Sequence, residues 1–374
     1  DYILDWLAAG RIGGVILFAR NVDNPQQLAD LTYACHTAAR RPILIAIDQE
    51  GGYVARLRAQ QGFSESPGAM ALSAANGADG ERYAESVSRM LAAEMRAVGI
   101  NWDYAPVLDL SYNADNPTVG TRSFGADKER VAQLGVASTL GFQSGGVAAC
   151  AKHFPGLGDT NIDTHEALPA LDTSPEHLLQ NDLLPYQATI DAGIVSIMTT
   201  HTIYTALDAQ HPVTLSPVAL KQLLRDQLGY NGVVTSDCME MKAIADNYGP
   251  GEAAVMGVLA GIDIVLFSHT REMQEAAYDA MLQAAHEGRI PADVIDAAVT
   301  RVQELKARFA ITDAPNIDLI RNETHQQLAQ DAARAGLVAL QPNADLLPLP
   351  QGQRIVLVEF ASYLESNVLE SGGM

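Results

Sequence analysis

The chain has 374 residues, of which 48% are hydrophobic and 18% charged, a composition that excludes collagen-like and largely disordered chains. Its formal net charge of −21 repels phosphate backbones and anionic membrane surfaces, so we expect no nucleic acid among its partners. No apolar run approaches the ~20 residues that a bilayer span needs, which predicts no membrane span.

Short apolar runs alternate with helical segments along most of the chain, a pattern that predicts a parallel sheet with helices outside it. Nearly every residue of these runs is apolar, as is usual for strands that are buried on both faces. Seven strands are predicted: Gly14–Phe18, Ile43–Ile47, Ile100–Ala105, Val147–Lys152, Val195–Thr199, Gly232–Ser236 and Ile262–Phe267.

Three helices between these strands have readable ends. Asn24-Pro25 predicts an N-cap followed by proline in the first turn, and Ser216-Pro217 repeats the same device later in the chain. A longer helix is predicted over Glu81–Val98, with Gly99 near its C-cap position.

The alternation predicts an α/β fold, a (β/α)₈ barrel of the TIM type, whose first strand would precede this chain because none is found before the first helix. The alternative is an open doubly wound sheet, but no G-x-G-x-x-G motif follows any strand. After about Phe309 come a loop, a helix around Glu323–Gly336 and a strand at Arg354–Phe360. We therefore expect a catalytic barrel over residues 1–309, a linker and helix over 310–335, and the incomplete beginning of a second α/β domain over 336–374.

Polar side chains stand where four of the predicted strands end. These are Asp48, the pair Lys152-His153, His201 and Asp237. The loops at the carboxyl ends of barrel strands converge and build active sites there. Four polar positions at the same end of one barrel therefore predict a catalytic centre.

Asp237 ends the apolar strand Gly232–Ser236. An aspartate at such a junction often does no more than cap the following helix. The functional alternative is a nucleophile, because a carboxylate with an ordinary pKa of ~3.9 is ionised at neutral pH and can attack an anomeric carbon.

The segment Lys152–His165 contains two glycines and a proline that favour a non-helical loop able to lie over a pocket. Asp163 and His165 stand two positions apart, so a bent loop can bring the carboxylate to the imidazole. That contact would fix the tautomer of the imidazole and raise its basicity. We interpret the pair as a proton-transfer dyad rather than as a surface histidine.

Five further side chains are candidates for binding a ligand. Lys152 and His153 end a buried strand, where an unpaired charge is costly and sugar hydroxyls or a structural carboxylate would satisfy their donors. Arg122 lies in a turn-rich piece that can present its guanidinium fork inward. Asp48 and Arg56 complete the set, and for each residue a structural salt bridge stays an equal alternative.

Together these segments resemble glycoside hydrolase family 3, in its bacterial β-N-acetylhexosaminidase branch. The matching segments are Ile47–Gly52, Gly120–Gly125, Lys152–His165 with Pro169, and Ser236-Asp237. The Lys-His-Phe-Pro-Gly loop that ends in Asp-x-His is the most specific of them. Cys238 after Asp237 also favours this branch, since the β-glucosidase branch usually has an aromatic residue there.

The resemblance implies a retaining hydrolysis of terminal β-linked N-acetylglucosamine, with a covalent glycosyl-enzyme on Asp237. His165, held by Asp163, would act as acid and then as base. By the same resemblance, the sugar hydroxyls would be bound by Asp48, Arg56, Arg122, Lys152 and His153. No metal and no organic cofactor is implied.

Four other functions stay open on the sequence. A phosphorylase would use phosphate in place of water, and a neutral histidine would tolerate that dianion better than a carboxylate would. A β-glucosidase, a non-catalytic sugar-binding barrel, and a metal-dependent hydrolase with His153, His165, His201 and Asp237 as ligands are less favoured.

The residues do not identify the natural aglycone, since muropeptide fragments, chitin oligomers and glycans end in the same sugar. The oligomeric state also stays open. Because the chain does not begin with Met, a leader is not excluded, and both cytoplasm and cell envelope remain possible compartments. The cysteines Cys35, Cys150 and Cys238 form no C-x-x-C pair, and the first two are predicted to be core residues.

Overall fold

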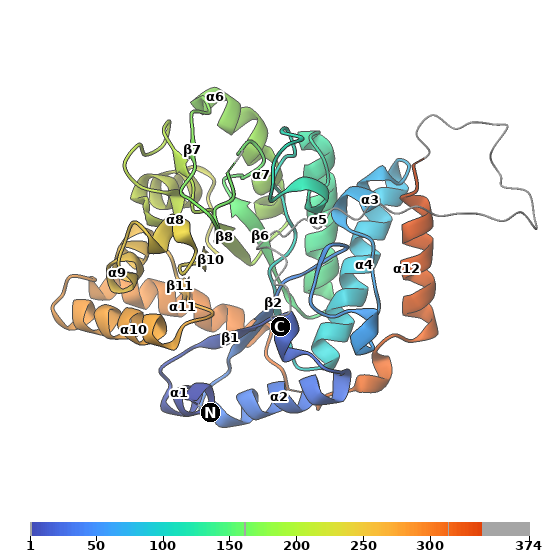
Figure 1. Cartoon of the computed structure of the whole chain (residues 1–374), viewed down its shortest axis with the longest axis horizontal. Coiled ribbons are helices and arrows are strands. Elements are labelled where there is room, and N and C mark those ends of the chain that lie inside the picture. The colour runs from blue at the N-terminus through green and yellow to red at the C-terminus, as the bar shows by residue number, and fades with distance from the viewer. Residues whose placement is uncertain (1, 161, 313, 339–374) are drawn as a thin grey trace, which may run out of the picture.

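The computed structural model describes residues 2–160, 162–312 and 314–338, and it contains the predicted parallel sheet (Figure 1). Its seven strands run in the order β1-β2-β5-β6-β8-β10-β11, and every neighbouring pair is parallel. The strands are β1 (Gly14–Leu17), β2 (Leu44–Ile47), β5 (Trp102–Asp103), β6 (Ala148–Phe154), β8 (Ser196–Thr199), β10 (Val233–Cys238) and β11 (Ile264–Leu266). All seven sequence-predicted strands are thereby confirmed, and the sheet curls as part of a TIM-type barrel.

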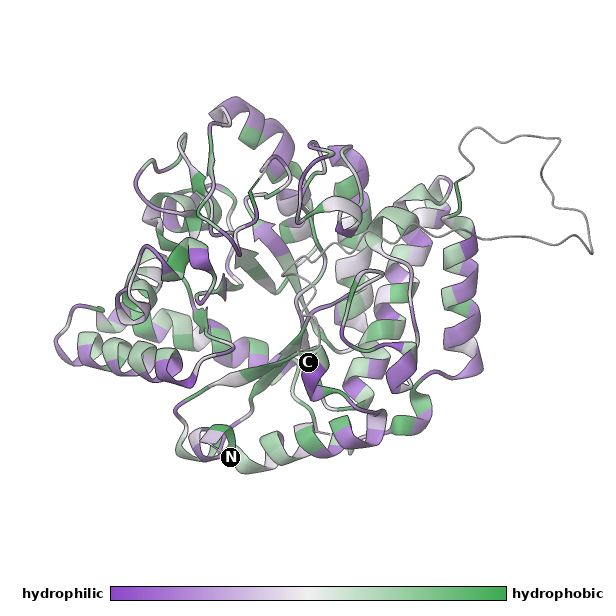
Figure 2. Ribbon diagram, in the orientation of Figure 1, coloured by the Kyte–Doolittle hydropathy of each residue, from purple (hydrophilic) through white to green (hydrophobic). Residues whose placement is uncertain are grey.

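Burial explains why these segments read as continuous apolar runs. Every residue of β2, β6 and β8 is buried, because helices cover one face of the sheet and the curled interior the other. Figure 2 shows largely hydrophobic strands and outer helices that carry hydrophilic stripes. Cys35 and Cys150 are both buried, as predicted for core residues.

The outer helices follow the strands along the chain. They are α1 (Tyr2–Ala9), α2 (Pro25–Ala38), α3 (Ala69–Ala74), α4 (Ala78–Ala97), α5 (Lys128–Ser144), α6 (Pro175–His177), α7 (Leu183–Asp191), α8 (Lys242–Ala245), α9 (Pro250–Ala260), α10 (Arg271–His286), α11 (Ala292–Arg308) and α12 (Glu323–Ala335). Two segments, Leu178–Asp182 and Val218–Gln227, wind with the wider hydrogen bonding of a π-helix.

The predicted helix ends are close to those observed. Asn24 caps α2 by accepting the N–H of Gln27, and the Ser216 hydroxyl accepts the N–H of Ala219 at the start of its helix. The helix predicted from Glu81 begins three residues earlier, at Ala78, after Gly77, which provides no side-chain cap.

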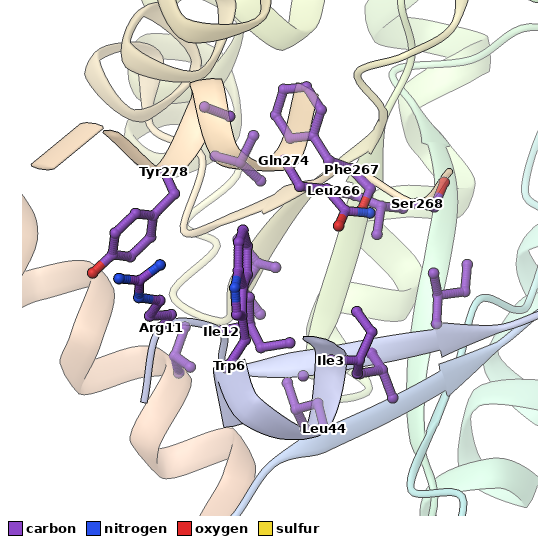
Figure 3. A pocket seen from close by; sticks show the side chains of 18 of the residues that line it. Ile3, Trp6, Arg11, Ile12, Leu44, Leu266, Phe267, Ser268, Gln274 and Tyr278 are labelled. Atoms are coloured by element: carbon purple, nitrogen blue, oxygen red, sulfur yellow. The ribbon is translucent and has the colours of Figure 1, made fainter. Parts of the chain in front are cut away.

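The first and last strands of the sheet, β1 and β11, do not pair with each other in the described residues. A cavity of about 1430 Å³ lies between them, bordered by α1, α10 and α11. Trp6, Arg11 and Tyr278 are among the side chains that line it, together with apolar residues of both strands (Figure 3). None of the predicted site residues lines this cavity.

The helix predicted around Glu323–Gly336 is observed as α12. It is attached to the barrel by Glu94 of α4, whose carboxylate accepts the backbone N–H of Arg321 and hydrogen-bonds Nδ1 of His325. The strand predicted at Arg354–Phe360 lies outside the described residues, so the second domain stays a prediction. No helix among the described residues is both long and apolar enough to cross a membrane.

Candidate active site

The polar residues predicted at the strand ends meet at the carboxyl edge of the sheet. Lys152 in β6 reaches Asp48 after β2, with 2.7 Å between Nζ and Oδ1. The imidazoles of His153 and His201, from the ends of β6 and β8, act electrostatically on Asp237 in β10. The topology thus brings residues from four strands into one site, as the sequence predicts.

A chain of alternating charges forms one wall of the site. Lys152 Nζ lies 2.7 Å from Asp48 Oδ1 and 2.7 Å from Glu50 Oε1. Arg122 binds Glu50 through two parallel hydrogen bonds of 2.8 and 2.7 Å. Arg56 extends the chain at the other end, 3.5 Å from Asp48 Oδ2. Arg122 therefore forms the salt bridge that the sequence left as an alternative.

This charge chain keeps its carboxylates ionised although they are poorly solvated. Burial raises the pKa of Asp48, but Lys152 and Arg56 outweigh it and hold the pKa below its ordinary value. Burial also raises the pKa of Glu50, but Arg122 and Lys152 outweigh this effect and lower the pKa to about 2. Burial lowers the pKa of Lys152, yet Asp48 and Glu50 raise it overall. All of these groups are therefore charged at neutral pH.

Glu50 was not among the predicted site residues. It lies on β3 (Gln49–Gly51), which turns back into β4 (Val54–Ala55), and its side chain is only 5% exposed. Gly51 and Gly52 follow with φ of +86° and +58°, a left-handed turn that favours glycine. An acidic residue directly before two glycines at a strand end was the available signal.

Asp109 is a second residue that the sequence reading missed. It is buried, and its Oδ2 lies 2.7 Å from Nδ1 of His153. Its Oδ1 accepts the backbone N–H groups of His153 and Leu157, at 3.2 and 2.8 Å. Asp109 thus orients the His153 ring and also fixes the start of the loop that follows β6.

The predicted dyad forms in that loop. Nδ1 of His165 lies 2.7 Å from Oδ1 of Asp163, and the same oxygen accepts the backbone N–H of His165 at 2.8 Å. An ionised carboxylate only accepts, so Nδ1 carries the proton and Nε2 is left for exchange with a ligand. Burial lowers the pKa of His165, but Asp163 outweighs it and the pKa is raised.

Asp237 is partly exposed, so a ligand can reach it. Burial raises its pKa, but the neighbouring imidazoles, His153 first, bring it below the ordinary value. Its Oδ1 accepts the backbone N–H of Cys238 at 2.7 Å, a local bond rather than a helix cap. The carboxylate is therefore ionised and oriented, as a nucleophile has to be.

His201 supports the peptide that follows Asp237. Its Nε2 donates to the carbonyl of Cys238 at 3.0 Å, and its Nδ1 lies 2.8 Å from the hydroxyl of Thr214. Burial lowers the pKa of His201. Both nitrogens thus have protein partners, and among the described residues no group of three or more His, Cys, Asp or Glu is arranged to hold a metal ion.

Comparisons with known proteins point to one family. The Glycosyl hydrolase family 3 N terminal domain matches residues 2–305. Beta-hexosaminidase A of Pseudoalteromonas piscicida is 34% identical over 371 residues, which cover 92% of this chain and 62% of that protein. A beta-hexosaminidase of Bordetella bronchiseptica is 37% identical over 324 residues, 85% of this chain and 87% of its own.

Solved structures give the same picture. A glycoside hydrolase family 3 beta-N-acetylglucosaminidase from Paenibacillus sp. superimposes with a TM-score of 0.86 at 40% identity, over 90% of this chain and 65% of its own. NagZ from Neisseria gonorrhoeae, in complex with N-trifluoroacetyl-D-glucosamine, gives 0.75 at 30% identity, over 87% of this chain and 91% of its own. The chain therefore spans less than two thirds of the Pseudoalteromonas and Paenibacillus proteins and most of the shorter relatives.

Proposed function

Because the chain belongs to glycosyl hydrolase family 3, we propose that it is a glycoside hydrolase that releases terminal, non-reducing β-linked N-acetylglucosamine. The observation that carries the proposal is that an ionised, reachable Asp237 acts electrostatically on His165 of the Asp163–His165 dyad. The beta-hexosaminidase and beta-N-acetylglucosaminidase names of its relatives support the choice of sugar.

The first step uses Asp237 as nucleophile. Its carboxylate attacks C1 of the sugar while the bond from C1 to the aglycone oxygen breaks. Protonated His165 gives the proton on Nε2 to that oxygen, so the aglycone leaves as a neutral alcohol. The raised pKa of His165 supports this role, because a larger fraction of the imidazole is protonated near neutral pH.

The second step reverses the roles of the same groups. Neutral His165 takes a proton from water, the water oxygen attacks C1, and the bond from C1 to Asp237 breaks. Asp163 stabilises the imidazolium that forms, through the 2.7 Å contact to Nδ1. The two substitutions at C1 give retention of the anomeric configuration.

The charge chain is the proposed binding wall for the sugar hydroxyls. Asp48, Arg56 and Lys152 hold one another, and Glu50 holds Arg122, before any substrate arrives, so little reorganisation is needed on binding. Lys152 has three N–H donors and uses two on Asp48 and Glu50, which leaves one for a hydroxyl. His153, oriented by Asp109, is the fifth member of the proposed set.

A phosphorylase is the second candidate, because His165 in place of a carboxylate does not repel a phosphate dianion. A Beta-glucoside phosphorylase BglX shares the fold with a TM-score of 0.78 at 21% identity, a likeness that carries no argument on activity. Hydrolysis stays the main proposal, since the more similar relatives named above are hexosaminidases and glucosaminidases.

The test is release of nitrophenol from p-nitrophenyl β-N-acetylglucosaminide and from the matching β-glucoside, with and without phosphate. We expect release from the amide sugar alone, at a rate independent of phosphate. Asp237→Ala should abolish it, whereas Asp279→Ala, on the exposed face of α10, should leave it unchanged. Phosphate-dependent formation of a sugar 1-phosphate would replace the proposal with the phosphorylase, and full activity of Asp237→Ala would overturn the mechanism.

A further inference from the structure

The loop that carries His165 is held at its start by a neighbouring loop. Asp109 Oδ1 accepts the N–H of Leu157 at 2.8 Å. On the other side, Nδ2 of Asn116 donates to the carbonyls of Leu157 and Gly158, at 2.9 and 3.1 Å. Leu157 is thus bound at both of its backbone groups by residues more than forty positions away in the chain.

Asn116 is buried, and its partners allow only one orientation of its amide. The Oδ1 side faces three donors, namely the N–H and hydroxyl of Thr118 and the N–H of Val119, at 2.9, 3.1 and 2.7 Å. The Nδ2 side faces two carbonyls, which only accept. The oxygen therefore shapes the turn of its own loop, and the nitrogen alone binds the loop of His165.

Gly158 is also held by close packing against the backbone of Leu110. A Cβ on Gly158 would overlap the carbonyl oxygen of Leu110, so the two backbones touch where only glycine fits. Leu157 and Gly158 are therefore held against residues 109–116 by hydrogen bonds and by contact.

Between this point and the dyad, Thr160 and Ile162 are hydrogen-bonded to each other. Thr160 is buried, its hydroxyl lies 3.0 Å from the carbonyl of Ile162, and its own carbonyl accepts from Asn113 at 3.4 Å. Asp163 follows one residue after Ile162, with the 2.7 Å contact to His165. A shift at Leu157 and Gly158 would thus be transmitted to the imidazole.

We infer that Asn116 is a positioning residue for proton transfer by His165, acting through Leu157 and Gly158. The inference rests on the proposed function. In the described part of the chain, Asn116 makes no hydrogen bond to any residue of the proposed catalytic or sugar-binding set. Its Oδ1, however, holds Thr118, whose carbonyl accepts from Arg122, so the oxygen has to stay in place. Loss of the two N–H donors alone should misplace the acid while the nucleophile and the sugar contacts stay as they are, and about 1 Å of misplacement is enough to cost a large factor in rate.

The sharpest variant is Asn116→Asp. It keeps an oxygen for Thr118 and Val119, but it replaces both donors to Leu157 and Gly158 by an acceptor that repels their carbonyls. Asn231→Asp is the matched control, because Asn231 is exposed, donates to a single backbone carbonyl, that of Gly229, and gains the same charge.

The measurement is kcat/KM on two β-N-acetylglucosaminides, one with 2,4-dinitrophenol and one with phenol as leaving group. Dinitrophenolate leaves without a proton, whereas phenol needs one, so only the second reports on the acid. For Asn116→Asp we expect a loss of roughly tenfold or more on the phenyl substrate and less than roughly threefold on the dinitrophenyl substrate. Asn231→Asp should match the wild type on both.

An equal loss on both substrates would mean that Asn116 only supports the fold, and no loss on either would mean that the loop is held without it. Both results overturn the inference. If Asn116→Asp does not fold, Asn116→Ser is smaller and uncharged, keeps an oxygen that can accept from the turn at Thr118, removes both N–H donors to Leu157 and Gly158, and is read in the same assay with the same expectation. If the wild-type protein releases neither dinitrophenol nor phenol, the proposed function is contradicted instead. The two failures are therefore distinguishable.

Discussion

Oδ1 of Asp163 binds His165 twice, once at the ring Nδ1 and once at the backbone N–H, at 2.7 and 2.8 Å. The side chain and main chain of the proton carrier are thus fixed by a single oxygen. The carboxylate settles both where the imidazole lies and which nitrogen is free to exchange a proton.

Replacement of Asp163 by Asn should remove the charge that raises the pKa of His165. Glycosylation needs the protonated imidazole, so the alkaline limb of kcat/KM on a phenyl substrate should move to lower pH. We expect a loss of roughly 10²-fold at pH 8 and a smaller one at pH 5. A pH profile of kcat/KM measures this, with Asp279→Ala as control, and an unmoved alkaline limb would contradict the assigned dyad.

The same interaction should link protonation of His165 to folding. A raised pKa in the folded state stabilises the protein below the unfolded value of ~6.5, and the contribution disappears as pH rises through the folded value. Wild type should therefore lose stability relative to Asp163→Asn as pH rises from 6 to 9. Urea unfolding of both proteins at several pH values tests this; parallel curves would count against it.

Glu50→Gln should weaken the charge chain, because Lys152 and Arg122 both lose a charged partner. Removal of one partner from a buried network costs roughly 3 kcal/mol of unfolding free energy. We also expect KM to rise more than kcat falls, since the binding wall is affected before the nucleophile. Thermal unfolding and steady-state kinetics measure both effects, with Glu304→Gln on the exposed side of α11 as control.

The difference in unfolding free energy between wild type and Glu50→Gln should depend on pH, because the pKa of Glu50 is about 2 in the folded protein. A depressed pKa gives stability above the unfolded value of ~4.3, and this stability is lost as pH falls toward the folded value. The gap in unfolding free energy between wild type and Glu50→Gln should be constant above about pH 5 and narrow below about pH 4. A gap that does not change down to pH 2.5 would rule out the charge-chain account.

Glu94 should control the attachment of α12. Its carboxylate accepts from Ser64, Arg321 and His325, although it lies on α4. Glu94→Gln should speed amide hydrogen exchange across Glu323–Ala335 while kcat on the nitrophenyl substrate stays within roughly twofold of wild type. Unchanged exchange in α12 would show that packing alone holds the helix.

The sequence predicts the sheet well because each strand is recognisable from its own residues, as an apolar run that is buried on both faces. It also predicts which residues stand at the strand ends and that Asp163 reaches His165, two positions away. The supporting residues were missed because their partners are distant in the chain. Glu50 binds Arg122 across 72 positions and Asp109 binds His153 across 44, so neither segment alone indicates a contact.

The alternating order Arg56–Asp48–Lys152–Glu50–Arg122 has a consequence for how such a site can change over time. Each carboxylate lies between two cations, so a replacement of Asp48, Lys152 or Glu50 leaves two neighbours poorly compensated, and the harm depends on what those neighbours are. Effects of substitutions here should therefore be strongly non-additive. Two or three members of the charge chain have to be exchanged together. Evolution of this site by single substitutions should therefore pass through few stable intermediates.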